Sequence, residues 1–166
     1  MVKCSFSDMS CPIAKALDVI GEWWTMLILR DFMIFGGQRG FEDLRDSLGI
    51  SRNILTERLK RLHEEGLLEK VPQVEGGKRM KYQITEQGLD LLPVMIGIKQ
   101  WSDKWLAHPD HDHVKFVDSR DKLPLAELQI HAADGRPLTH GEVLPQPNSE
   151  AAQAYVEQRM MVANND

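Results

Sequence analysis

Apolar residues recur at helical spacing near the start of the chain and predict two consecutive helices. The first helix is expected to open at Pro12 and to end at Gly21, with Cys11 or Ser10 as its cap. The second helix, over residues 22–35, is apolar almost all round, which is typical of a buried central helix. The apolar face of the first helix is predicted to consist of Ile13, Ala16, Leu17 and Ile20.

The next segment predicts a helix–turn–helix. Phe41, Leu44 and Leu48 follow the i, i+3, i+7 pattern of a short third helix. Gly49 closes that helix and Ser51 opens a fourth one, because glycine suits a helix C-terminus and serine suits an N-cap. The two helices are therefore expected to meet at a tight joint.

The fourth helix, predicted over residues 51–65, has two different faces. Leu55, Leu59 and Leu62 form its inner face. Arg58 falls toward this apolar side, so we expect it to be a structural ion-pair partner. The opposite face carries Arg52, Asn53, Thr56, Glu57 and Lys60.

Two strand-like runs follow, at residues 67–74 and 79–85, and the Gly-Gly pair between them is a hairpin signal. In the second run, Met80, Tyr82 and Ile84 alternate with Lys81 and Gln83. One face of the hairpin is therefore expected to pack and the other to be solvated.

A long final helix is predicted over residues 86–106, capped by Thr85 and kinked at Pro93. Its apolar stripe is wider than one small domain can cover, so a homodimer interface is the expected use. The stripe contains Leu91, Met95, Ile98 and Trp105, with Val94 and Trp101 beside it.

Charge is distributed unevenly along the 166 residues. The formal net charge is −5, but residues 106–166 alone hold five basic and ten acidic residues. Residues 50–82 hold eight basic and five acidic residues. The acidity therefore belongs to the tail, and the helix–turn–helix and hairpin are locally positive.

The predicted order of elements is that of a winged helix, in an α+β, mostly α fold with a two-stranded wing. The second helix of the turn pair fits the DNA major groove, and the hairpin reaches phosphates. Charged surface residues also occur on winged helices that dock other proteins, which is the alternative function. We favour DNA because basic residues occur on both elements. The predicted contacts are Arg52, Asn53, Thr56 and Lys60 in the groove and Lys78, Arg79 and Lys81 on the wing, with Arg39 and Thr25 as further phosphate contacts.

Three segments resemble the HxlR family: CPIAKALDVIGEWWTMLILRDF, GFEDLRDSLGISRNILTERLKRLHEEGLLEK and GKRMKYQITEQGLDLLPVMIGIKQWSDKW. The resemblance covers residues 11–106 without a break. It implies a homodimeric bacterial transcription regulator of winged-helix type, related to MarR-like proteins. It also implies a palindromic operator whose half-sites lie about 34 Å apart.

The same resemblance suggests how the regulator is switched. Cys11 stands where some members of the family sense electrophiles or oxidants, and a helix N-terminus favours the thiolate. Cys4 would be its disulfide partner, in either subunit. The alternative is that Cys11 is a small buried residue or an inert cap. Other members respond to small molecules, and the candidate pocket residues are Trp23, Trp24, Trp101 and Trp105, which could instead be simple core.

The remaining predictions concern boundaries and absences. We expect an arm at residues 1–10, a DNA-binding and dimerisation domain at 11–107 and an extension at 108–166. The extension resembles a zinc-ribbon-like hairpin followed by a helix, but His131 and Asp134 replace the expected cysteines, so no metal is predicted. HPDHDH at 108–113 is expected to be a solvated helix exit rather than a weak metal site.

No membrane or catalytic segment is predicted. The chain has no apolar run of transmembrane length, and its first residues lack a signal-peptide core, so we expect a cytoplasmic protein. No nucleophile–base pair or phosphate loop is visible, so neither an enzyme nor a cofactor is expected.

Overall fold

The computed structural model describes residues 6, 9–75, 77, 79–106 and 114–163. The chain forms two compact units, Met1–Ala126 and Glu127–Asp166, which are treated separately below. The first unit extends further than the predicted domain boundary at residue 107. One reason is that residues 114–126 return to the helix before them, where Gln100 Nε2 donates a hydrogen bond to the Ala126 carbonyl at 2.9 Å.

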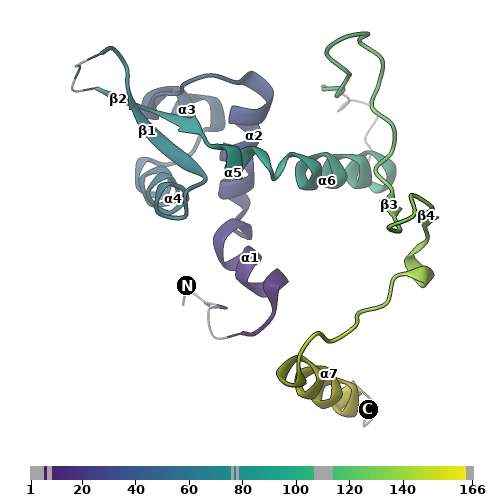
Figure 1. Ribbon diagram of the computed structural model, residues 1–166. Coiled ribbons are helices and arrows are strands. Elements are labelled where there is room, and N and C mark those ends of the chain that lie inside the picture. Colours follow the sequence, from purple (N-terminus) through teal and green to yellow (C-terminus); the bar gives the residue numbers. More distant parts are fainter. Residues whose placement is uncertain (1–5, 7–8, 76, 78, 107–113, 164–166) are drawn as a thin grey trace. The chain divides into compact units, whose positions relative to one another are not determined.

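The first unit begins with four helices, α1 (Pro12–Ile20), α2 (Trp23–Phe35), α3 (Phe41–Leu48) and α4 (Arg52–Glu64) (Figure 1). They surround one apolar core, which confirms the prediction of a buried central α2. The core consists of Ile28, Leu29, Phe32, Leu44, Ile50, Leu55, Leu59, Leu62, Leu67 and Leu68.

The joint between α3 and α4 matches its prediction. Gly49 ends α3 with φ of +62°, a left-handed conformation that glycine adopts without steric cost. The Ser51 hydroxyl then accepts a hydrogen bond from the backbone N–H of Ile54 at 3.4 Å. Together these two residues turn the chain sharply, so that α4 leaves α3 with its leucines inward.

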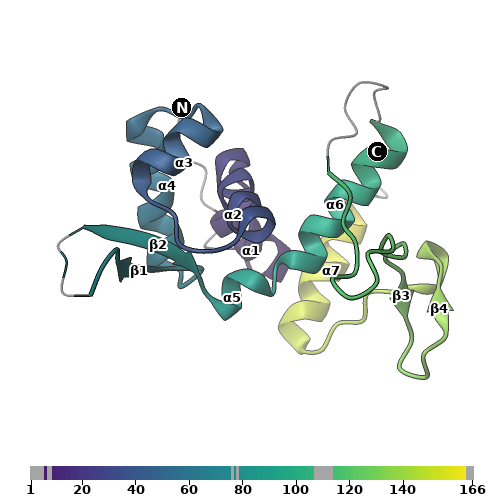
Figure 2. The same ribbon diagram turned by 90° about the horizontal axis from the view of Figure 1, so that it is seen from above.

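The hairpin consists of β1 (Leu68–Pro72) and β2 (Met80–Ile84), paired antiparallel with Leu68 opposite Ile84. It projects from the helical body in both views (Figures 1 and 2). Arg39 pairs with Tyr82 along the other edge of β2, through N–H···O bonds of 2.9 and 2.8 Å.

The predicted alternation along β2 is only partly right. Tyr82 and Ile84 pack against the core as expected. Met80 is exposed because it lies at the end of β2 that projects beyond the core. Gln83 is half-buried, since the Gln38 amide bonds to its side-chain oxygen at 3.4 Å. Lys81 is half-buried as well.

The single kinked helix predicted at the end of the domain is wrong, because the structure has two helices there. Thr85 caps α5 (Glu86–Leu89), its hydroxyl accepting from the Gly88 N–H at 3.1 Å. A second helix, α6 (Leu92–Trp105), begins after a break. Pro93 lies in the first turn of α6, where its missing N–H costs no hydrogen bond, so it starts a helix rather than kinking one.

Most of the apolar stripe on α6 is uncovered in the single chain. Leu91 and Met95 pack against the core, and α6 then leads away from α1–α4 (Figures 1 and 2). Trp101 is 57% exposed and Trp105 is 66% exposed. The structure therefore leaves an apolar helix face open to solvent.

The predicted apolar face of α1 is only partly buried in the single chain, where Ile20 packs against the core. Ala14 is the buried residue, whereas Ile13 and Leu17 are exposed. The apolar positions were identified correctly, but the helix packs onto α2 through a different side. Ile13 and Leu17 consequently add to the exposed apolar surface.

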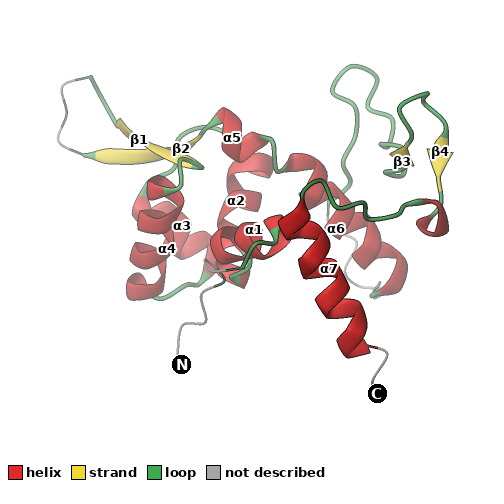
Figure 3. Cartoon of the chain, turned by 60° about the horizontal axis from the view of Figure 1, so that its bottom comes forward, coloured by secondary structure: helices red, strands yellow, loops and turns green. Residues whose placement is uncertain are grey.

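The second unit contains a small hairpin and a helix. Strands β3 (Ile130–His131) and β4 (Pro137–Leu138) pair antiparallel, as the predicted hairpin of the extension requires. A short 3-10 helix, η1 (His140–Glu142), and α7 (Glu150–Ala163) follow. Figure 3 colours the strands of both two-stranded sheets yellow among the red helices.

Two features are absent from the part of the chain that the structure describes. None of the helices there is long and apolar enough to cross a bilayer. Within the same ranges, no three His, Cys, Asp or Glu side chains gather in a group that could hold a metal ion. The HPDHDH run at 108–113 lies outside the described residues.

Candidate nucleic-acid interface

The outer face of α4 carries the predicted groove-contacting residues. Arg52, Asn53, Thr56 and Lys60 are all exposed, whereas the inner leucines Leu55, Leu59 and Leu62 are 0% exposed. The inner face holds α4 against the core, so the helix presents its polar side at a fixed angle. A helix anchored in this way can enter a groove without rearranging its own fold.

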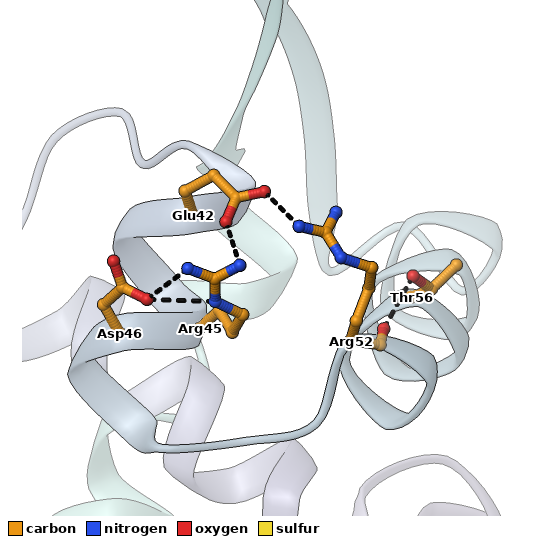
Figure 4. Close-up of polar contacts among 5 residues, drawn as sticks. All are labelled: Glu42, Arg45, Asp46, Arg52 and Thr56. Atoms are coloured by element: carbon orange, nitrogen blue, oxygen red, sulfur yellow. Dashed lines mark hydrogen bonds and ion pairs between the residues drawn. The ribbon is translucent and has the colours of Figure 1, made fainter.

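Arg52, the first residue of α4, is held in place by two residues of α3. Its Nη2 donates to Glu42 Oε1 at 2.8 Å (Figure 4). Its guanidinium carbon lies 5.1 Å from the centre of the Phe41 ring. The carboxylate fixes one edge of the guanidinium, and the ring supports its plane. The remaining N–H groups of Arg52 are left to face other partners.

Glu42 belongs to a small charged network on α3 (Figure 4). It also forms an ion pair with Arg45, which donates to Asp46 Oδ1 through Nε at 2.9 Å and Nη2 at 2.7 Å. The hydrogen bond to Asp46 raises the pKa of Arg45, and the negative charges of Asp46 and Glu42 add to this effect. The Glu42 carboxylate therefore lies beside the N-terminus of α4, with Asp46 further along the same network, and the interface is not uniformly basic.

The other residues of the outer face differ in how they are engaged. The Thr56 hydroxyl donates to the Arg52 carbonyl at 2.8 Å, which commits its proton and leaves its oxygen as an acceptor. The Lys60 side chain is mostly exposed, and its Nζ lies 3.7 Å from Glu64 Oε1. Asn53 makes no side-chain hydrogen bond to any described residue. Its amide therefore offers both a donor and an acceptor for recognition.

Two arginines of α4 are structural, as predicted for the first of them. Arg58 is buried and its Nη2 lies 2.8 Å from Glu57 Oε1. Arg61 pairs with Asp18 of α1 at 3.4 Å and with Glu65 at 3.0 Å. The ion pair with Arg58 also engages Glu57, the one acidic residue of the predicted outer face.

Of the predicted hairpin contacts, Arg79 is exposed and Lys81 is half-buried, while Lys78 lies outside the described residues. Arg39 is half-buried, with its guanidinium 5.0 Å over the Phe35 ring. Its Nε is buried and has no hydrogen-bond partner within the described chain. Arg58 Nε is buried without a partner in the same way, so this feature does not distinguish Arg39 from a structural arginine.

The predicted phosphate contact of Thr25 is wrong. Thr25 lies in the first turn of α2 and is 1% exposed, so its hydroxyl cannot reach a ligand in solution. The same apolar packing that buries α2 encloses this residue.

The candidate sensor residue occupies its expected place. Cys11 is the N-cap of α1, is half-buried and carries a free thiol. Its side chain makes no capping hydrogen bond, so the thiol has no such structural role at the helix start. Cys4 lies outside the described residues.

The four tryptophans do not form a pocket. Trp24 packs on the edge of the core, as the alternative interpretation held, whereas Trp23, Trp101 and Trp105 are exposed. A pocket of about 350 Å³ lies elsewhere, between α2, α6 and residues 114–116. It is lined by Arg30, Ile34, Met95, Ile98, Lys99, Ser102, Asp103, Val114 and Phe116.

Sequence reasoning missed Glu42, which engages Arg52, and the charged pair Arg30 and Asp31 in α2. A signal for the latter was present, because an Arg-Asp pair in the middle of an almost wholly apolar helix demands partners. No signal in the sequence places Glu42 next to Arg52, because that contact depends on the angle between α3 and α4.

Comparison with known proteins identifies relatives of the whole arrangement. Residues 19–110 match the HxlR-like helix-turn-helix family. The chain is 40% identical over 135 residues to the uncharacterised HTH-type transcriptional regulator Mb3122 of Mycobacterium bovis, covering 81% of this chain and 84% of the relative.

Solved structures of transcription factors superpose on this chain as well. PA1607, a candidate transcription factor, superposes with a TM-score of 0.79 at 38% identity, covering 87% of this chain and 100% of that one. The reduced form of the transcriptional regulator YodB from B. subtilis superposes with a TM-score of 0.50 at 28% identity, covering 58% and 95%. These relatives are transcription regulators and not enzymes. The winged-helix order, the family match and these bacterial relatives together show that the chain belongs to the HxlR-like helix-turn-helix family of transcriptional regulators.

Proposed function

We propose that this regulator binds a palindromic operator in double-stranded DNA as a homodimer, with α4 in the major groove and the β1–β2 hairpin on the backbone. The observation that carries the proposal is the division of α4. Its leucines are fully buried, and its four polar outer residues are all exposed on a helix that the core holds rigidly.

Arg52 and Asn53 supply the base contacts in this proposal. An arginine recognises guanine and an asparagine recognises adenine through paired hydrogen bonds, each worth about 1–3 kcal/mol of discrimination. Arg52 is supported for this role by Glu42 and Phe41, and Asn53 by its unengaged amide. Lys60, Arg79, Lys81 and Arg39 supply phosphate contacts.

The homodimer follows from the uncovered face of α6. Val94, Ile98, Trp101 and Trp105 lie within a narrow sector of the helix at 100° per residue, and all four are exposed. Exposed apolar stripes of this width mark interaction surfaces. A second copy offers the same stripe, so the two can pack about a two-fold axis, and a two-fold dimer matches a palindromic operator.

The proposal is tested by fluorescence anisotropy on the DNA upstream of the gene, across a series of salt concentrations. The Lys81→Ala variant should reduce the slope of log affinity against log salt by about 0.9, because one phosphate contact is lost. Lys15→Ala, which removes an exposed lysine from α1, is the matched control and should leave the slope unchanged. An unchanged slope for Lys81→Ala removes the hairpin from the interface. No binding at low salt would favour the protein-docking alternative.

We also propose that DNA binding responds to oxidation of Cys11 or to a small-molecule effector. Support for the first comes from a free, half-buried thiol at the start of α1. Treatment with a thiol oxidant should change operator affinity in wild type but not in Cys11→Ser. Cys4→Ser shows whether the second cysteine is needed. If oxidised and reduced wild type bind alike, Cys11 is not the sensor and the small-molecule effector becomes the leading account.

A further inference from the structure

The pocket beside α6 has an apolar interior and a charged rim. Ile34 of α2, Met95 and Ile98 of α6, and Val114 and Phe116 of the returning segment form its walls. At about 350 Å³ it falls within the range of small-molecule sites in proteins. It lies wholly inside the first unit, away from the outer face of α4.

Two cations line the same pocket, Arg30 from α2 and Lys99 from α6. Arg30 donates through Nε and Nη2 to Asp31 Oδ1, at 3.2 and 2.7 Å. Lys99 Nζ donates to Asp103 Oδ2 at 2.6 Å. A guanidinium has five N–H donors and an ammonium has three, so both cations keep donors beyond these bonds.

We propose that this pocket binds a small monocarboxylate with an apolar body, aromatic or alkyl. The carboxylate would lie between Arg30 and Lys99, and the body would fill the space between Ile98, Val114 and Phe116. A charged group that enters an apolar pocket must be paired and hydrogen-bonded, and these two cations meet that requirement. A neutral ligand of the same shape would leave the rim unused.

A buried carboxylate, Asp31, links the pocket residue Arg30 to α3 of the helix–turn–helix. Asp31 is 0% exposed, and besides Arg30 it accepts a hydrogen bond from the Ser47 hydroxyl of α3 at 2.6 Å. A ligand carboxylate that binds the remaining donors of Arg30 would reposition the guanidinium and weaken its bonds to Asp31. Because a buried carboxylate cannot be left with a single donor cheaply, its bond to Ser47 and the position of α3 are expected to change. This coupling rests on the proposed function, whereas binding in the pocket does not.

Binding is tested by ligand-detected NMR with phenylacetate, octanoate and phenylacetamide. Both carboxylates should bind saturably at millimolar concentration, and the amide at least tenfold more weakly. Lys99→Gln should weaken phenylacetate at least tenfold, while Lys15→Gln, a matched exposed lysine, should not. Ile34→Trp, which fills the pocket, should abolish binding. This variant tests the site without changing Arg30, whose substitution would break the pair with buried Asp31 and could unfold the protein. Equal binding of acid and amide, no saturable binding, or full binding by Ile34→Trp would overturn the proposal.

The proposed coupling between the pocket and DNA binding is tested by a separate measurement. Phenylacetate should change the operator affinity of wild type, and Ser47→Ala should bind phenylacetate normally but lose most of that change. A Ser47→Ala response equal to wild type would overturn the relay. If the protein binds no DNA, the proposed function fails, and the NMR titration still decides whether the pocket binds carboxylates.

Discussion

Helices α4 and α6 both carry an apolar stripe, but only the stripe of α4 is buried within the single chain. Leu55, Leu59 and Leu62 of α4 are fully buried against the core. Trp101 and Trp105 of α6 remain more than half exposed. The stripe of α4 fixes the position of the helix against the core, whereas most of the stripe of α6 is exposed in the single chain. An apolar pattern therefore predicts an apolar face, and not whether the same chain covers it.

The largest effect is expected on the inner face of α4. Leu59→Ala should lower the free energy of unfolding by about 2–5 kcal/mol, because it leaves a cavity in a close-packed core. Urea unfolding followed by circular dichroism measures this loss. Thr56→Ala, on the outer face of the same helix, is the control and should stay within about 0.5 kcal/mol. Equal losses from both variants would contradict the division of α4 into two faces.

The stripe of α6 should respond in a different way. Trp101→Ala should weaken dimerisation by about 2 kcal/mol, roughly 30-fold in the dissociation constant, because exposed tryptophans of an apolar stripe are typical interface hot spots. Sedimentation velocity over a range of protein concentrations measures the change. Asp103→Asn, on the opposite side of α6 at 100° per residue, should leave the dimer intact. A monomeric wild type would refute the proposed use of α6.

The outer face of α4 should affect recognition without affecting stability. Asn53→Ala should lower the preference for operator over scrambled DNA by about 1–3 kcal/mol, while binding to scrambled DNA stays unchanged. Lys60→Ala should instead weaken both by a similar factor, because a phosphate contact carries no sequence information. Anisotropy titrations with both DNAs give these values. An Asn53→Ala variant with wild-type preference would move the base contacts elsewhere.

The smallest expected effect concerns Glu42, and its sign is informative. Glu42→Gln removes a negative charge beside the DNA, so binding to scrambled DNA should rise, by less than about 1 kcal/mol at an exposed site. The preference for operator should fall, because Arg52 loses the carboxylate that orients it. Asp46→Asn removes a charge from the same network without touching Arg52, so it should raise both affinities equally. Identical behaviour of the two variants would mean that Glu42 acts only through its charge.

Much of the first unit follows from local patterns. The leucine spacing predicted the inner face of α4, and Gly49 and Ser51 predicted the joint before it, because capping and periodicity are properties of neighbouring residues. The outer residues of α4 followed from the same geometry. Local patterns were also sufficient to separate Arg58, which is buried, from Arg52, which is not.

The wrong predictions share one cause, because a local sequence pattern does not determine how distant segments pack against each other. Ile13 and Leu17 are apolar and yet exposed, because α1 contacts α2 through the side that contains Ala14. The four tryptophans were candidates for core or for a pocket, but only Trp24 packs on the core, and the pocket is lined by α2, α6 and residues 114–116. Pro93 was predicted to kink one long helix, but the chain breaks before Leu92 and Pro93 lies in the first turn of a new helix.

The central claim is that two copies of α4 contact one operator, and hydroxyl-radical footprinting of the upstream DNA tests it most directly. Wild type should protect two sites about 34 Å apart, one helical turn along the duplex, as two-fold related α4 helices require. Trp101→Ala at concentrations where it is monomeric should lose this paired protection. A single protected site in wild type, or paired protection by the monomeric variant, would contradict the account.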